Sequence, residues 1–417
     1  MKLIIKNAVV IFIAIASIEA LGQGKKLLVK NDYEVAVYYF PNYHPDSINS
    51  KWHGKDWTEW EVVKAAKPRF KGHEQPKVPS WGYFNEADPK WAAKEIDLAA
   101  DNGIDCFIYD WYWYSNTGRY LHDGLEKGFL KAPNRSRLKF ALMWANHDWL
   151  NIHPASFDDG RVKLTEGEVT AALWDTISTY IVEKYFKQPN YWLIDGKPYF
   201  SIYEIVTFIN GVGGIEEAKK AIQLLDTKTK AAGFPGVHFN IMSMMVNDYH
   251  VNTITGSGAP ANAKEMVKAL GVESVSTYCY LHHYNANKDG FPTVPMEKAF
   301  ASAKNYWRKF TAEYAEVLYT PNVSMGWDAS PRCIQSDKFE MKDYPWTPVL
   351  VGNTPASFQN QLQEAKKFLD EYNPKHKIVV LNSWNEWTEG SYLEPDTINK
   401  MKYLEAIKEV FGKKKFN

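Results

Sequence analysis

Two glutamates near the carboxyl end of the chain have the residue type and the spacing for acid–base chemistry. Glu386 and Glu389 are three residues apart and lie between Trp384 and Gly390. Cleavage of a glycosidic bond usually needs two carboxyl groups, one protonated to assist the leaving oxygen and one ionised to promote attack at or near the anomeric carbon. Mutual repulsion and low polarity separate the pKa values of such a pair. In the alternative interpretation Glu386 pairs with a cation such as Arg332, and Glu389 is a solvated loop charge.

Aromatic and polar side chains are mixed at the ends of the β-rich runs of the sequence. Rings stack on the apolar faces of sugars, while amide, imidazole and carboxylate groups bind hydroxyl groups. Core packing better explains any single ring, but nine of the sixteen tryptophans lie between Trp52 and Trp149, mostly at such ends. Together they indicate a carbohydrate site. The candidate substrate-binding residues are Tyr43, His44, Trp60, Asp110, Trp113, Asn146, Tyr203, Glu204, His282, His283, Trp327, Asp328, Arg332, Trp384, Asn385 and Trp387.

Other kinds of catalytic or metal site have less support in the residue pattern. Asp110 and Glu204 form a second candidate carboxylate pair. No GxSxG elbow for a serine nucleophile is found. His282 and His283, with Asp248 and His250 upstream, match no zinc spacing, so hydroxyl binding or packing explains these histidines. We therefore expect no bound metal and no cofactor.

These residues must be positioned by the β-rich runs that precede them, and the sequence contains eight such runs alternating with helical patterns. The runs are Val35 to Phe40, Ile104 to Trp111, Leu138 to Trp144, Tyr199 to Tyr203, Val237 to Met244, Ser274 to Leu281, Val317 to Met325 and Ile378 to Asn382. Helices are predicted after Asp88-Pro89 and Thr354-Pro355, where a capping residue precedes proline, and over Glu166 to Phe186, Glu216 to Ala232, Lys264 to Leu270, Met296 to Tyr314 and Ile398 to Phe411.

The alternation of nearly apolar strands with helices predicts an α/β fold, a (β/α)8 TIM barrel that forms a single catalytic domain. A doubly wound sheet is disfavoured because no GxGxxG turn follows the first strand. The long segment from Pro45 to Asn85 is rich in tryptophan and charge, so we expect a folded excursion over the barrel mouth. In such barrels the active site lies at the carboxyl ends of the strands.

Composition narrows the class of ligand. The chain of 417 residues has 49 basic and 49 acidic side chains, which disfavours nucleic acid as a partner because phosphate binding needs an excess of Lys and Arg. The three cysteines, Cys106, Cys279 and Cys333, allow at most one disulfide bond. A poly- or oligosaccharide is the expected partner.

The first residues have the pattern of a signal peptide. Lys2 and Lys6 precede an apolar run from Ala8 to Ile18, which is shorter than the roughly 20 residues that span a bilayer. Small residues follow, and no cysteine is placed for a lipid anchor. We expect cleavage after residues 1–22, a domain over residues 23–417, no membrane insertion after cleavage, and a periplasmic or secreted location.

Several motifs resemble a known family. The segment NEWTEGSYLEPD, from Asn385 to Asp396, is similar to the corresponding segment of glycoside hydrolase family 99, the endo-α-mannosidases. The remainder resembles the family 99-like proteins named after WbsX, whose label began as a glycosyltransferase of polysaccharide biosynthesis. The motifs are YYFPNYHPD, DWTEWEVVKAAKPRFKGHEQPKVP, WGYFNEADP, NGIDCFIYDWYWY, FALMWAN, IDGKPYFSIYE and GWDASPR.

The resemblance implies a mechanism without a glycosyl-enzyme intermediate. Glu386 would take the proton from the substrate 2-hydroxyl, which attacks C1 to form a 1,2-anhydro sugar. Glu389 would protonate the leaving oxygen and later activate water, which gives net retention. Such a route favours α-mannose or α-rhamnose. This chain departs from the pattern at Thr388, where family 99 has histidine, and in WANHDW, from Trp144 to Trp149, where WbsX relatives have WANENW.

Three functional classes follow from the sequence. The first is an exported retaining glycoside hydrolase that cleaves α-glycosidic bonds. The second is a glycosyltransferase of polysaccharide biosynthesis, although an exported enzyme has no supply of nucleotide sugar. The third is a non-catalytic carbohydrate-binding protein, which would keep its binding after loss of both glutamates.

Overall fold

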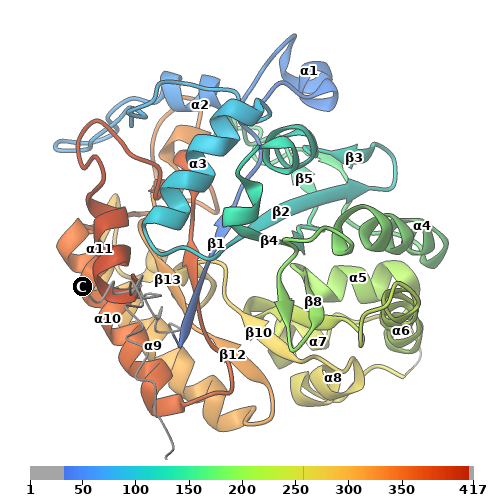
Figure 1. The fold of residues 1–417 in the computed structure, drawn as a ribbon. Coiled ribbons are helices and arrows are strands. Elements are labelled where there is room, and N and C mark those ends of the chain that lie inside the picture. Colours follow the sequence, from blue (N-terminus) through green and yellow to red (C-terminus); the bar gives the residue numbers. More distant parts are fainter. Residues whose placement is uncertain (1–31, 257, 413–417) are drawn as a thin grey trace, which may run out of the picture.

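Nine parallel strands form a nearly closed barrel in the computed structural model, which describes residues 32–256 and 258–412 (Figure 1). Their order around the barrel is β12, β10, β9, β8, β4, β2, β1, β15 and β13. The bounds are β1 (Tyr33–Tyr39), β2 (Cys106–Tyr114), β4 (Lys139–Trp144), β8 (Lys197–Ile202), β9 (His238–Met242), β10 (Ser274–Ser276), β12 (Leu318–Thr320), β13 (Asn322–Ser324) and β15 (Lys377–Asn382). The predicted α/β barrel is confirmed.

The seventh position of the barrel holds two short strands in place of the single predicted run. β12 pairs with β10, and β13 pairs with β15, so the two strands lie at the two ends of the strand order, on either side of the remaining gap in the barrel. Pro321 separates them, because proline has no N–H to donate to a ladder. Its carbonyl oxygen still accepts a hydrogen bond from the Val380 N–H at 3.0 Å.

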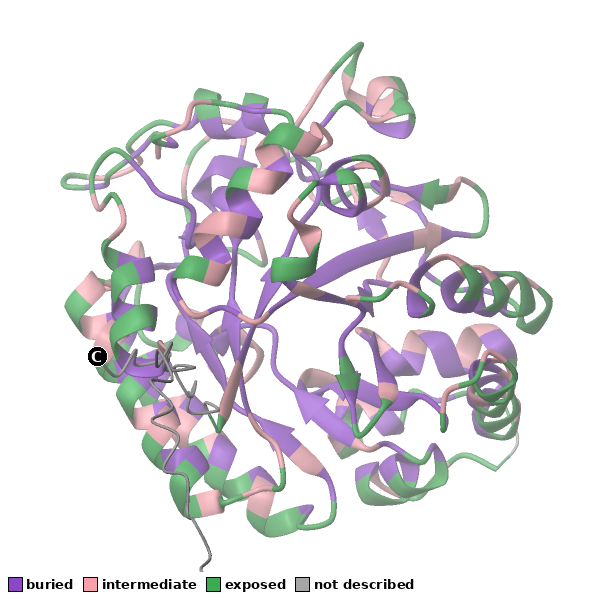
Figure 2. Ribbon diagram, in the orientation of Figure 1, coloured by how far each residue is buried: buried purple, intermediate pink, exposed green. Residues whose placement is uncertain are grey.

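Helices surround the strands, with buried faces toward the barrel and exposed faces outward (Figure 2). They are α1 (Ser47–His53), α2 (Trp60–Ala65), α3 (Pro89–Asp101), α4 (Ala171–Ile181), α5 (Ile205–Val212), α6 (Ile215–Ala231), α7 (Asp248–Val251), α8 (Ala263–Ala269), α9 (Met296–Glu313), α10 (Pro355–Tyr372) and α11 (Lys402–Phe411). The predicted caps of α3 and α10 are confirmed: Asp88 accepts from the Lys90 N–H and Thr354 from the Ser357 N–H.

The excursion after β1 is folded, as expected, and carries α1 and α2 at the top of Figure 1. It is tied to the segment after β15 by the bridge between Pro79 and Asp396. The other small strands are β3 (Gly118–Tyr120), β5 (Trp149–Leu150), β6 (Lys163–Thr165), β7 (Leu193–Ile194), β11 (Thr293–Pro295), β14 (Val349–Val351), β16 (Asn385–Glu386) and β17 (Ser391–Tyr392).

The structure differs from the sequence prediction in two strands that lead to the site. β2 extends beyond Trp111 to Tyr114, because β3 pairs with its end as a hairpin. β10 ends at Ser276, and the residues after it form a loop and a 3-10 turn. The predicted signal peptide lies outside the described residues. Among the helices of residues 32–256 and 258–412, none has the length and apolar content to cross a membrane.

Candidate active site

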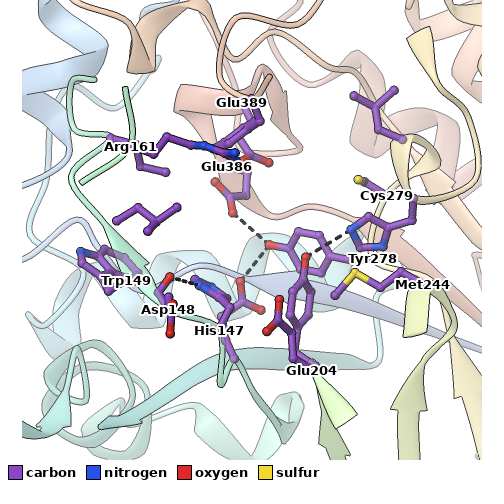
Figure 3. Close-up of a pocket in the computed structure, with 18 of the residues that line it drawn as sticks. His147, Asp148, Trp149, Arg161, Glu204, Met244, Tyr278, Cys279, Glu386 and Glu389 are labelled. Carbon is purple, nitrogen blue, oxygen red and sulfur yellow. Dashed lines mark hydrogen bonds between the residues drawn. The ribbon is translucent and has the colours of Figure 1, made fainter. Parts of the chain in front are cut away.

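A cavity of about 1150 Å³ opens where the carboxyl ends of the barrel strands converge (Figure 3). Its wall combines carboxylates, phenols, imidazoles and indoles, the groups that a carbohydrate site uses. Nine of the residues predicted for the site line it: Asp110, Tyr203, Glu204, His282, His283, Trp327, Arg332, Glu386 and Glu389.

The two candidate catalytic glutamates both lie in this wall. Glu386 ends the short strand β16, and Glu389 ends the 3-10 turn that follows it. The turn changes the direction of the chain, so residues three positions apart both reach the cavity. Their exposed fractions are 4% and 7%, so Glu389 is not a solvated loop charge.

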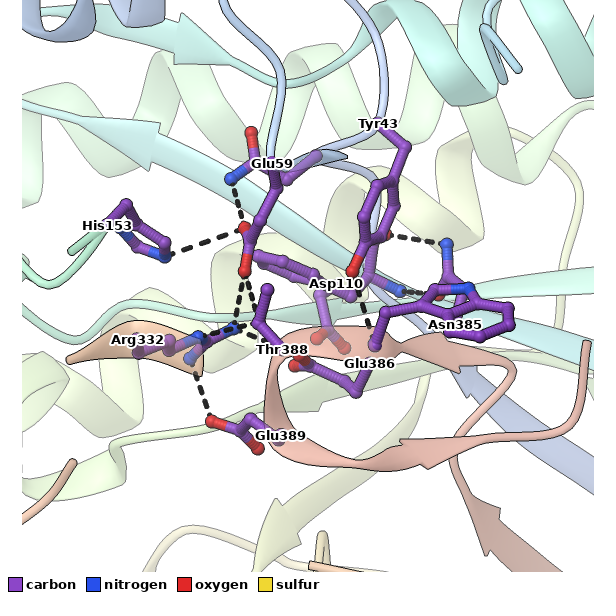
Figure 4. Close-up of polar contacts among 12 residues, drawn as sticks. Tyr43, Glu59, Asp110, His153, Arg332, Asn385, Glu386, Thr388 and Glu389 are labelled. Atoms are coloured by element: carbon purple, nitrogen blue, oxygen red, sulfur yellow. Dashed lines mark hydrogen bonds and ion pairs between the residues drawn. The ribbon is translucent and has the colours of Figure 1, made fainter. Parts of the chain in front are cut away.

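Arg332 connects the two glutamates (Figure 4). Its Nη2 lies 3.0 Å from Glu386 Oε2, and its Nη1 lies 2.8 Å from Glu389 Oε1. The guanidinium is itself almost fully buried. Because one planar cation holds both carboxyl groups, their relative position is fixed.

The excursion supplies a third carboxylate beneath this pair. Glu59 Oε1 lies 3.1 Å from Arg332 Nη2, and Glu59 Oε2 accepts from Asn42 Nδ2 at 2.6 Å. The Thr388 hydroxyl donates to Glu59 and accepts from Arg332 Nε at 2.8 Å. Thr388, the position where family 99 has histidine, therefore contributes to the network under the glutamates.

Tyr278 and Tyr344 contact the glutamates from two other segments. The Tyr278 hydroxyl lies 2.9 Å from Glu386 Oε1 and 2.8 Å from Asp110 Oδ2. The Tyr344 hydroxyl donates to Glu389 Oε1 at 2.7 Å and accepts from Arg332. Each candidate catalytic carboxyl group thus has one phenol and the shared guanidinium as partners.

Burial shifts the pKa values of three carboxyl groups near Arg332. It raises the pKa of Glu386 well above its usual range, with repulsion from Glu389 as the next cause and Arg332 acting against both. Burial likewise raises the pKa values of Asp110 and Glu59. Four buried carboxyl groups around one guanidinium cannot all be ionised at low cost.

The opposite wall presents neutral imidazoles to the cavity. Burial lowers the pKa of His282 to about 4 and that of His283 to about 3. His282 Nε2 lies 3.2 Å from the Tyr203 hydroxyl, and His283 Nε2 lies 2.7 Å from the Ser243 hydroxyl. A neutral imidazole has one donor and one acceptor nitrogen, which suits sugar hydroxyl groups.

The other nine predicted residues lie outside the lining of this cavity: Tyr43, His44, Trp60, Trp113, Asn146, Asp328, Trp384, Asn385 and Trp387. Two of them are amides that hold neighbouring strand ends together. Asn146 accepts a hydrogen bond from the Glu204 N–H and donates one to the Glu204 carbonyl, each at 2.8 Å. Asn385 likewise accepts from the Phe40 N–H and donates to the Phe40 carbonyl, also at 2.8 Å.

The two tryptophans beside the catalytic pair are buried behind the wall. Trp384 Nε1 donates to Glu95 Oε1 at 2.9 Å, and Trp387 Nε1 donates to Glu394 Oε2 at 2.5 Å. Both indoles are at most 1% exposed. They anchor the segment that carries the glutamates to buried carboxyl groups.

The remaining predicted residues also make structural contacts. The Tyr43 hydroxyl accepts from the Trp387 N–H at 3.1 Å. Trp60 Nε1 donates to the Phe84 carbonyl at 2.7 Å. His44 Nδ1 lies 2.7 Å from Glu86 Oε1, Asp328 Oδ2 lies 2.7 Å from His73 Nε2, and Trp113 packs edge to face on Tyr180.

Several lining or supporting residues were missed by the sequence analysis. Glu59 and Tyr344 lie in long connections, where no periodic pattern singles them out, and their partners are distant in sequence. Tyr278 follows β10 within a run that was assigned to a strand. His147, Trp149 and His153 come from the loop after β4, where the WANHDW departure was the available signal.

Among residues 32–256 and 258–412, no group of three His, Cys, Asp or Glu side chains is arranged to hold a metal ion. His250 Nδ1 contacts Asn247, whereas His282 and His283 contact Tyr203 and Ser243. The three cysteines are free and buried.

Comparisons with known proteins add a family and a shared fold. A protein of Xanthomonas campestris pv. campestris strain B100 named "Uncharacterized protein WxcX" is 24% identical over an alignment of 390 residues, and the match covers 90% of this chain and 49% of that protein. This chain thus spans about half the length of that relative.

Two solved structures share the fold at 15% identity. The GH99 endo-alpha-mannosidase from Bacteroides thetaiotaomicron has a TM-score of 0.55 and covers 90% of this chain and 95% of its own. A structure named glycoside hydrolase-like protein has a TM-score of 0.57, with 92% and 95% covered. A family model described as glycosyltransferase WbsX matches residues 35–407. The chain therefore belongs to this WbsX family, with a barrel like that of a GH99 endo-alpha-mannosidase.

Proposed function

We propose that this protein is a retaining glycoside hydrolase that cleaves α-mannoside- or α-rhamnoside-like bonds in poly- or oligosaccharides. The observation that carries the proposal is the placement of Glu386 and Glu389 in the cavity wall, held side by side by Arg332. The cavity volume of about 1150 Å³ leaves room for more than one sugar ring.

In the proposed reaction Glu386 accepts the proton of the substrate 2-hydroxyl, and O2 attacks C1. The bond from C1 to the leaving oxygen breaks as Glu389 gives that oxygen its proton. Glu389 then takes a proton from water, which attacks C1 and opens the 1,2-anhydro ring, while Glu386 returns its proton to O2. Two inversions at C1 give net retention.

The contacts of Glu389 leave one of its carboxyl oxygens available to the leaving group. Its Oε1 already accepts from Arg332 and Tyr344. A proton on this carboxyl group is therefore carried by Oε2, which leaves Oε2 free to serve the leaving group. Arg332 contacts Glu386 Oε2 as well as Glu389 Oε1, so it stabilises the carboxylate form of each. The assignment of Glu386 as base and Glu389 as acid follows the resemblance of the motif to family 99.

The direct test is the product formed from α-mannan and α-rhamnan oligosaccharides, with the anomer followed by NMR from the start of the reaction. We expect an α product first. Glu386→Gln should lose turnover and keep substrate binding, whereas Glu216→Gln, on an exposed turn of α6, should match the wild type. A β product or an active Glu386→Gln variant would overturn the assignment.

The family description favours a second candidate, a glycosyltransferase. In that case the protein transfers sugar from a nucleotide sugar to a polysaccharide acceptor. It then releases no sugar from an oligosaccharide when the nucleotide sugar is absent. A third outcome, binding without turnover that survives loss of both glutamates, indicates a carbohydrate-binding protein.

We also propose that the protein acts in the periplasm or outside the cell, on the basis of the signal-peptide pattern in residues 1–22. N-terminal sequencing of protein recovered from the cell exterior or periplasm should give a chain that begins near Gln23. Recovery of the intact chain from the cytoplasm contradicts export.

A further inference from the structure

The hydroxyl group of Tyr278 lies between two carboxyl groups, that of Glu386 (Figure 3) and that of Asp110. Its oxygen is 2.8 Å from Asp110 Oδ2 and 2.9 Å from Glu386 Oε1. A phenol has one hydrogen, so it donates to one carboxylate only. Its contact with the other is a hydrogen bond only if that carboxyl group carries a proton.

The surroundings of the two carboxyl groups differ in a way that places this proton on Asp110. Glu386 Oε2 has the Arg332 guanidinium at 3.0 Å, which stabilises a carboxylate. Asp110 Oδ1 is buried and makes no hydrogen bond with the described residues. An ionised carboxylate with a buried, unpartnered oxygen is costly, whereas a neutral acid tolerates it.

We propose that Asp110 is held as a carboxylic acid that donates to Tyr278, so that Tyr278 donates to Glu386 and keeps Glu386 ionised for its role as base. The proposal rests on the proposed function in its last clause. In this role Asp110 is a positioning residue, because it acts on the reaction through Tyr278 and Glu386.

The charges around the pair are consistent with this assignment. Burial raises the pKa values of both Asp110 and Glu386 well above their usual ranges, and Arg332 acts against this rise at both groups but contacts only Glu386. Burial also raises the pKa of Tyr278, which therefore stays a neutral phenol. The titratable groups that interact with Asp110 or Glu386 are Tyr38, Tyr43, Glu59, Tyr112, Tyr203, Tyr278, Cys279, Arg332, Tyr344 and Glu389.

The first experiment needs no substrate and records infrared spectra of the folded protein at neutral pH. The difference between the wild type and Asp110→Asn should contain the carbonyl band of a protonated carboxyl group. The difference spectrum between the wild type and Glu386→Gln should contain the bands of an ionised carboxylate. Carboxylate bands in the Asp110→Asn difference would overturn the proposal, and circular dichroism confirms that both variants are folded.

The second experiment follows the acidic limb of the kcat/KM profile. Tyr278→Phe removes a hydrogen bond to the Glu386 carboxylate, so the limb should move to higher pH by about one to two units. In Asp110→Asn the amide N–H replaces the acid O–H as donor to Tyr278, and the limb should stay near that of the wild type. The matched control is Tyr280→Phe, which removes another buried phenol, one that donates to Gln361 Oε1.

The outcomes separate this proposal from the proposed function. A limb that moves as far in Asp110→Asn as in Tyr278→Phe contradicts a neutral Asp110. If no glycoside is turned over, the proposed function fails, and the infrared spectra still decide whether Asp110 carries the proton.

Discussion

At the scale of single residues, Arg332 is the group on which the candidate site depends. From the sequence alone, pairing of Glu386 with Arg332 is an alternative to catalysis. In the structure Arg332 contacts Glu386, Glu389 and Glu59 together, and both candidate catalytic residues still line the cavity. Pairing and chemistry are therefore compatible here, because the cation positions the glutamates and offsets part of the cost of burying their charge.

Replacing Arg332 should show the cost of leaving these carboxyl groups without a cation. We expect Arg332→Met to lower the free energy of unfolding at neutral pH by about 3–5 kcal/mol, as for other buried pairs that lose one partner. Adding Glu59→Gln should restore part of the loss. Chemical denaturation measures both. The control is Arg137→Met, because Arg137 forms an exposed ion pair with Asp97, and this variant should change stability little. An equal loss of stability in Arg137→Met would argue against the buried network.

Glu389 should matter in proportion to the need of the leaving group for a proton. We expect Glu389→Gln to lose activity steeply, about 100-fold or more, on an oligosaccharide. An activated aryl glycoside needs little acid assistance, so its rate should fall much less. Steady-state kinetics on the two substrates provide the comparison. Equal losses on both substrates would remove Glu389 from the acid role.

At the scale of elements, the turn after β15 decides where the catalytic carboxyl groups point. The Glu386 N–H donates to the Ser383 hydroxyl at 3.0 Å, and the Glu389 carbonyl accepts from the Asp328 N–H. Gly390 then turns the chain with a φ of 64°. Two glutamates three residues apart can both face the cavity because this tight turn, and not an extended strand, holds the second one.

Gly390 should therefore be intolerant of a side chain. A Cβ at this position would lie 2.7 Å from Asp328 Cβ and 3.0 Å from its backbone nitrogen. We expect Gly390→Ala to lower the free energy of unfolding by about 1–2 kcal/mol through left-handed backbone strain. The substitution should also displace Glu389 and therefore lower kcat. Gly233→Ala has the same kind of backbone with open space around it and should lose stability alone. Unchanged kcat in Gly390→Ala contradicts this account.

At the scale of the whole molecule, the site is braced by a second group of buried acids that links a surrounding helix to the strand ends. Glu95 on α3 accepts from Trp384 and from the Tyr39 hydroxyl at 3.1 Å, and Glu394 accepts from Trp387. Burial raises the pKa of Glu95 to about 7 and that of Glu394 well above its usual range. Fold stability therefore depends on protons held far from solvent.

This dependence has a definite sign. A carboxyl group with a raised pKa in the folded state contributes stability that is fully present below the unfolded pKa of 4.5 and is lost as pH rises through about 7. Relative to Glu95→Gln, the wild type should lose on the order of 1–3 kcal/mol of unfolding free energy between pH 5 and about 8. Denaturation over this pH range measures it, with exposed Glu216→Gln as control; parallel curves for wild type and Glu95→Gln would contradict a protonated Glu95.

The local features were predictable because their causes are local. Strands such as β1 and β15 are continuous apolar runs, and α3 and α10 begin at a capping residue followed by proline, so each is visible in a short window. The pair Glu386 and Glu389 was visible in the same way. Strand β10 was predicted too long, because the apolar and aromatic residues after Ser276 continue the pattern of a strand while the chain turns toward the site.

The sequence by itself determined the α/β barrel, the excursion over its mouth and the two candidate catalytic glutamates. The tertiary structure decided which side chains face the cavity: it brought Glu59, Tyr278 and Tyr344 to the glutamates and turned Trp384 and Trp387 away to Glu95 and Glu394. The reason is physical. Periodicity reports which residues are buried, whereas the protonation of a buried carboxyl group depends on partners that meet only when distant segments are packed together.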